Sequence, residues 1–177
     1  AMDVKKAKDR PLSSGNRKVS LSSFAYLFCE LVQHCQSQID RGEDLEKRLS
    51  ATGYGIGLRL LELLSFRERN CRKERNVLQI LNFVRTTFWK SMFGKPADDL
   101  QISNTKKNEY YIKDRSPLTT KYISNPNAAR CASFTAGMIH GILDGSEFTC
   151  ENVAAVQSKD CIVFVITFSP KVIARNT

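Results

Sequence analysis

The stretch "GYGIGLR" at residues 53–59 places three glycines two residues apart, ahead of an apolar run that continues to Leu64. A phosphate-binding loop needs a strand before its glycines and a helix N-terminus after them, so that backbone N–H groups point at the phosphate. Here helix-forming residues precede Gly53 in register with those that follow, and the spacing matches neither G-x-G-x-x-G nor a P-loop. We therefore expect a helix interior. Each glycine costs about 1 kcal/mol there relative to alanine, so close approach of another backbone is the expected compensation.

A second stripe of small residues occurs in "NAARCASFTAGMIHGILDG" at 127–145. Small side chains recur every four residues and large apolar ones lie opposite, which predicts a helix with one smooth face. Charged residues within it exclude a membrane span. The stripe predicts flush packing within the domain or against a partner; it consists of Ala129, Ser133, Gly137 and Gly141.

Hydrophobic periodicity predicts four long helices and two hairpins. The helices are expected at 21–41, with Ser20 as N-cap, and at 44–69, 72–93 and 127–145. The expected hairpins join 100–104 to 109–114 and 152–157 to 161–168, and the last strand, apolar on both faces, should be central. The fold class is α+β, with about four long helices and a small four-stranded antiparallel sheet.

Charge and cysteine usage narrow the class of protein. The chain carries a net charge of +9, of which residues 1–18, expected to form a flexible basic arm, contribute +4. This balance suits an anionic surface or simple solubility. Six cysteines without a Cys-x-x-Cys pair favour a reduced intracellular protein over a disulfide framework. We expect neither a metal site nor a cofactor, because His34 and His140 lie far apart without partners at zinc spacing.

The sequence offers no catalytic grouping, and both histidines are expected to be structural. No RNA-binding motif is present, so nucleic-acid binding would rest on charge alone and is not expected. Cys71, in "RERNCRKER", lies among basic residues that favour a thiolate. It is a candidate for acylation, with an ordinary exposed cysteine as the alternative.

Several runs together resemble the TRAPP vesicle-tethering complex small subunits, of the subunit 5 type. The similarity extends in order from about Val19 to Arg175, which we take as one domain (19–177). The runs are "VSLSSFAYLFCELVQHCQS" (19–37), "FWKSMFGKPADDL" (88–100), "YISNP" (122–126), "CASFTAGMIHGIL" (131–143) and "VIAR" (172–175).

The resemblance implies a helical layer on a four-stranded antiparallel sheet and a scaffold role without catalytic residues. It implies a heterodimer with another TRAPP small subunit, one that is acylated, in a complex that tethers vesicles in ER-to-Golgi and Golgi traffic. That complex promotes nucleotide exchange on a Rab GTPase, mainly through other subunits. The location implied is cytosolic and peripheral on ER, cis-Golgi and Golgi membranes. In a paralogue the region around Cys71 carries an acylated cysteine, but the charged run here does not reproduce that motif.

We expect the partner contact on the first helix and the glycine-bearing second helix, where apolar residues exceed what one sheet can cover. The candidate residues are Phe24, Tyr26, Leu27, Phe28, Leu31, Val32, Cys35, Tyr54 and Leu58. Packing in the chain's own core is the alternative for the main stripe. A rival function is lipid or acyl-chain binding, in a tunnel lined by Leu60, Leu64, Val84 and Phe88.

Overall fold

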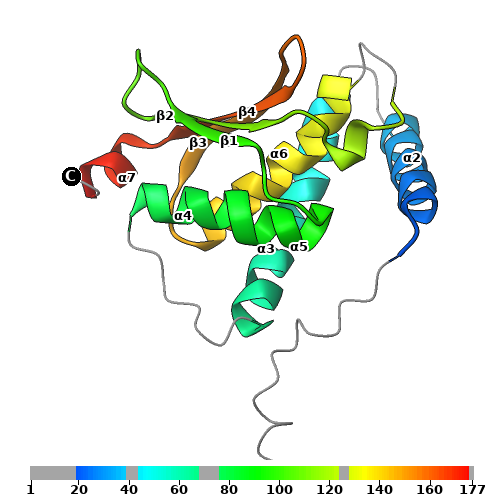
Figure 1. The fold of residues 1–177 in the computed structure, drawn as a ribbon, viewed down its shortest axis with the longest axis horizontal. Coiled ribbons are helices and arrows are strands. Elements are labelled where there is room, and N and C mark those ends of the chain that lie inside the picture. Colours follow the sequence, from blue (N-terminus) through cyan, green and yellow to red (C-terminus); the bar gives the residue numbers. More distant parts are fainter. Residues whose placement is uncertain (1–18, 39–43, 68–75, 124–127, 176–177) are drawn as a thin grey trace, which may run out of the picture.

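A four-stranded antiparallel sheet carries a layer of helices on one of its faces in the computed structural model, which describes residues 19–38, 44–67, 76–123 and 128–175 (Figure 1). The α+β prediction is confirmed. The helices are α2 (Leu21–Ser37), α3 (Leu45–Arg67), α4 (Val77–Phe83), α5 (Trp89–Phe93), α6 (Ala128–Gly145) and α7 (Pro170–Arg175), with a π-helical segment η2 (Val84–Phe88) and a 3₁₀ turn η3 (Leu118–Thr120). The strands are β1 (Asp99–Ile102), β2 (Glu109–Asp114), β3 (Cys150–Gln157) and β4 (Ile162–Phe168).

The strand order is β1-β2-β4-β3, so β4 is central and β1 and β3 are the edges, as the two-sided apolar pattern of β4 predicts. Every second residue of β4 is buried, from Ile162 to Phe168, against the helices. The alternate residues, such as Val163 and Val165, are half-buried on the other face. An antiparallel sheet covered on one side shows this alternation.

The predicted helix boundaries need small corrections. Ser20 caps α2, and its hydroxyl accepts a hydrogen bond from the Ser23 N–H. This helix ends at Ser37, short of the predicted 41, and residues 39–43 lie outside the described part. Both hairpins are confirmed. The predicted arm at 1–18 and Cys71 also lie outside the described residues.

The glycines of α3 and α6 bring the two helix backbones into direct contact. A Cβ built on Gly53 or Gly57 would overlap the carbonyl oxygens of Phe134 and Met138 on α6. Conversely, a Cβ built on Gly137 of α6 would overlap the carbonyl oxygen of Ser50 on α3. Cα–H···O contacts accompany such close crossings. The expectation of close backbone approach is confirmed, and the contact is within the domain.

The middle glycine of the motif, Gly55, behaves differently. Gly55 is exposed, and a Cβ built on it would have nothing within 4 Å.

The different surroundings of Gly55 and Gly57 predict opposite effects of substitution. We expect Gly57→Ala to lower the free energy of unfolding by roughly 1–3 kcal/mol, because the methyl group must push α6 away. Gly55→Ala should instead raise it by about 0.5–1 kcal/mol through helix propensity alone. Urea unfolding of the two variants measures both changes; equal effects would contradict the packing explanation.

The third predicted helix is continuous but changes its winding. α4, η2 and α5 follow one another without a break, and five residues in the middle form a π-helical turn. Phe88 and Trp89, consecutive in sequence, are both fully buried. A π turn widens the buried arc of a helix by accommodating one additional residue. Gly94, with φ +77°, ends the helix in the left-handed conformation that is typical of a glycine after a helix C-terminus.

The segment after this helix is joined to the sheet through a buried carboxylate. Asp114, at the end of β2, is fully buried and accepts a hydrogen bond from Trp89 Nε1 at 2.9 Å. The Lys95 ammonium lies 2.9 Å from the other carboxylate oxygen, which also accepts from the Ser116 N–H. The motif around Trp89 and Lys95 therefore acts as a structural clamp between α5 and β2.

The contacts of Asp114 predict that Lys95 contributes more to the stability of the fold than Lys90 does. Lys95→Met should lower the free energy of unfolding by roughly 2 kcal/mol, because it leaves a buried carboxylate without its cation. Lys90→Met, at an exposed position of α5, should change it by less than about 0.5 kcal/mol. Thermal unfolding followed by circular dichroism distinguishes the two; a mild effect at Lys95 would mean that neutral donors alone suffice for Asp114.

Candidate functional site

Helix α2 leaves part of its apolar surface uncovered. Tyr26 and Leu27 are 76% and 71% exposed, whereas Phe24, Leu31 and Val32 are half-buried. We call the exposed pair, Tyr26 and Leu27, the α2 surface. The three half-buried residues belong to the inward stripe of the helix, since Leu31 and Val32 pack against the hydrophobic core and the Phe24 ring stacks on that of Phe28. An exposed apolar surface on a helix is typical of a protein–protein contact.

Two of the interface residues expected on α2 lie beneath that surface. Phe28 is 4% exposed, and its ring lies 5.5 Å from the ring of Phe134 on α6. Cys35 is also buried in the core. Periodicity identifies the stripe to which both belong but does not reveal that α6 already covers its centre.

The two candidates on α3 face α6. The Tyr54 hydroxyl donates to Asp144 Oδ2 at 3.2 Å, and its ring packs edge-on against His140. Burial, helped by the Asp144 carboxylate, raises the pKa of Tyr54 above its usual value. Leu58 is half-buried against the end of α6 near Gly145. The structure thus separates Tyr54 and Leu58 from the α2 surface and places them at the α3–α6 junction.

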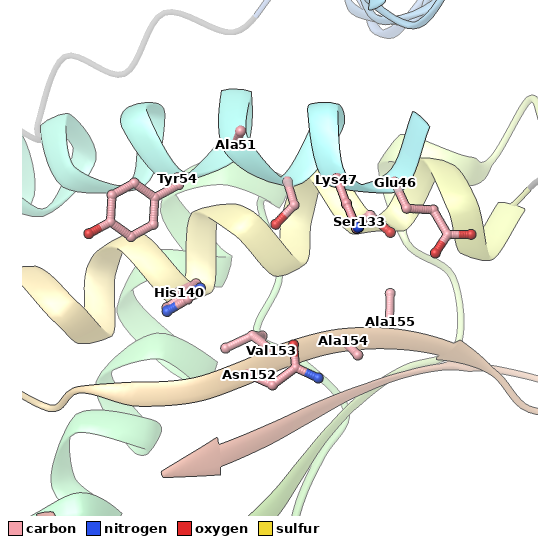
Figure 2. A pocket seen from close by; sticks show the side chains of 11 residues that line it. Glu46, Lys47, Ala51, Tyr54, Ser133, His140, Asn152, Val153, Ala154 and Ala155 are labelled. Carbon is pink, nitrogen blue, oxygen red and sulfur yellow. The ribbon is translucent and has the colours of Figure 1, made fainter. Parts of the chain in front are cut away.

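A groove lies between α3 and the edge strand β3, with residues of α6 between them (Figure 2). Its volume is about 510 Å³, within the range of ligand-binding clefts. Ser50, Ala51 and Tyr54 line it from α3, and Val153 and Ala155 line it from β3. Sequence analysis does not identify this groove, although the uncharged run of strand residues at 152–157 is a signal for an open edge.

Chemically reactive side chains are scattered. In the described ranges, no three His, Cys, Asp or Glu side chains gather to hold a metal ion. His140 lies 3.5 Å from Asp144, and His34 is exposed on α2. Burial raises the pKa values of the Cys131 and Cys150 thiols, which disfavours the thiolate. None of the helices in the described part is long and apolar enough to cross a bilayer.

The residues of the rival tunnel hypothesis fill core positions. Leu64, Val84 and Phe88 are buried and Leu60 is half-buried, all within one hydrophobic cluster. The groove described above is lined by other residues. The tunnel stays a prediction, as does acylation of Cys71.

Comparison with known proteins identifies relatives over nearly the whole chain. Residues 24–169 match the family model described as transport protein particle (TRAPP) component. The chain is 49% identical to trafficking protein particle complex subunit 5 of Dictyostelium discoideum, covering 95% of both chains. It is 42% identical to the human protein of that name, covering 95% of this chain and 90% of the relative.

The fold also has a solved counterpart. Trafficking protein particle complex subunit 3 from Naegleria fowleri, crystallised covalently bound to palmitic acid, superposes with a TM-score of 0.71. The match covers 84% of this chain and 95% of the other, at 14% sequence identity. At that identity the likeness concerns the fold alone.

Proposed function

The chain belongs to the TRAPP component family, and from this premise we propose that it acts as an assembly subunit that heterodimerises with another TRAPP small subunit. Its role as a component of the TRAPP complex follows from the homologues. The pairing partner, the support of Rab nucleotide exchange by the assembled complex and the attachment to ER and Golgi membranes are the finer parts of the proposal.

The observation that carries the proposal is the exposure of Tyr26 and Leu27 on α2. Both belong to a 17-residue helix whose inner stripe is already satisfied by α6 through Phe28. Large apolar side chains left outside a satisfied core are available to a partner, and aromatic residues are enriched at such contacts. The exposed Phe66 near the end of α3 is a further apolar residue outside the core.

The nature of the partner is inferred from the family. A subunit of the same fold, such as the subunit 3 type, presents comparable helices, and two amphipathic helices can bury their apolar faces together. The subunit 3 protein of Naegleria fowleri carries a covalently bound palmitic acid. We propose that the present chain pairs with an acylated subunit of this kind and does not itself perform the exchange reaction.

Leu27→Asp should weaken the complex with a subunit 3 type partner by at least about tenfold, because a carboxylate would be buried in an apolar contact. The fold should be unaffected, since Leu27 is exposed. Light scattering of the mixed chains and isothermal titration calorimetry measure the stoichiometry and the dissociation constant.

Gln36→Asp is the matched control, because it adds the same charge at an exposed polar position of α2 on the side opposite Leu27. It should leave the affinity within about twofold of the wild type. Equal binding by the Leu27→Asp chain would exclude the α2 surface as the contact. Phe28→Asp is unsuitable as a test, since Phe28 lies in the core.

A further inference from the structure

We propose that the free edge of β3, together with the adjoining groove, binds an extended segment of a partner protein as a fifth strand of the sheet. The inference goes beyond heterodimer formation through α2 and concerns another side of the molecule. It rests on the direction of the main-chain groups of β3, on the composition of that edge and on the position of α3 beside it.

The hydrogen-bond pattern of the sheet determines which main-chain groups of β3 are free. The Ser158 N–H donates to the Cys161 carbonyl, so Ser158 faces β4. Directions alternate along an antiparallel strand, and the register pairs Ala154 with Val165 and Val156 with Val163. The N–H and C=O groups of Val153 and Ala155 therefore point away from β4, toward the open edge.

The same alternation holds across the rest of the sheet. The Phe168 N–H donates to Asn108 beside β2, and the Asp98 N–H donates to Lys113 on β2. Both bonds agree with the directions deduced from Ser158. No described residue donates to or accepts from the outward groups of Val153 and Ala155. Strand edges of this kind are templates for pairing with another chain.

The two edges of the sheet are protected to different degrees. β1 has only four residues and begins with Asp99, and shortness and charge both discourage pairing. β3 has eight residues, and after an irregularity at its start its run "NVAAVQ" (152–157) contains neither a charge nor a proline. An unguarded edge of this length is expected to be covered in the working protein.

Helices α3 and α6 contribute walls to the groove beside this edge. Ser50 and Ala51 of α3 line the same groove as Val153 and Ala155 of β3, with Ser133 and His140 of α6 between them (Figure 2). A strand added beside β3 would place alternate side chains in the groove, over the small residues of α3. Main-chain bonds would supply affinity and the groove would supply selectivity, as in other strand-addition complexes.

The same geometry favours a partner segment over a second copy of this chain. Two copies paired edge to edge about a two-fold axis would form one continuous sheet with both helix layers on the same face. The α3 helix of each copy, which lines the groove beside β3, would then have to share that space with its counterpart. A single extended chain needs only the groove.

Heptapeptides selected from a random phage-displayed library against the full chain are the probe for this site. The selected peptides should shift the amide NMR signals of Val153 and Ala155 and slow their hydrogen exchange at least about tenfold. Methylation of alternate peptide nitrogens should weaken binding by at least about tenfold, because it removes the main-chain donors. Failure to select any peptide that affects these two amides would overturn the proposal.

Two substitutions locate the binding. Ala51→Trp fills the groove and should abolish peptide binding, whereas Glu62→Trp, at an exposed position of α3 outside the groove, should not. Equal binding to both variants would place the peptides elsewhere and contradict the proposal.

The same amide signals distinguish a partner segment from a second copy of the chain. Dimerisation that protects the Val153 amide in the absence of peptide would show that a second copy, and not a partner segment, covers the edge. Loss of subunit pairing by Leu27→Asp tests α2 separately, so the two proposals can fail independently.

A pair of prolines tests the direction of the main chain. Ala155→Pro removes an N–H that faces the open edge, so the chain should stay folded but lose peptide binding. Ala154→Pro removes a bond to β4 and should lower the melting temperature by several degrees more. If Ala155→Pro unfolds the chain as readily as Ala154→Pro, the outward groups are engaged within the domain and the edge is not free.

Discussion

The backbone contact between α3 and α6 is the constraint on which the rest of the structure depends. Glycines on both helices remove the side chains that would hold the axes apart, and carbonyl oxygens of each helix rest against the Cα atoms of the other. α6 is thereby enclosed between α3 and the sheet, and most of its residues are buried. α3 in turn is held where it can wall the groove beside β3.

Much of this arrangement is predictable from local pattern. Helical register across Gly53 excludes a nucleotide loop, and the four-residue repeat of small residues on α6 indicates a smooth face. What pattern alone leaves undecided is which helix meets that face, and the structure pairs Gly137 with the backbone of Ser50. The π turn between α4 and α5 is also missed, because nothing in "VRTTF" departs from ordinary helical composition.

The candidate site shows the same limit. Sequence periodicity places Phe28 on the main stripe of α2 and Leu27 off it, but it does not decide which of the two a partner would contact; in the structure Phe28 belongs to the core and Leu27 to the surface. Tyr54 is expected in the same contact as a residue of the glycine-bearing helix, but its hydrogen bond to Asp144 turns it toward α6. Burial depends on contacts between segments that are distant in the sequence. Composition and periodicity do not tell where those segments lie relative to one another.

The π turn at Val84–Phe88 makes the length of its segment matter more than its composition. A one-residue insertion there would turn everything on one side of it by about 100° relative to the other, because the π turn already holds one additional residue. Trp89 would then lose its alignment with Asp114, while the loop at 103–108 could change length at little cost. Among homologues, gaps should therefore avoid the middle of this helix even where its residues vary freely.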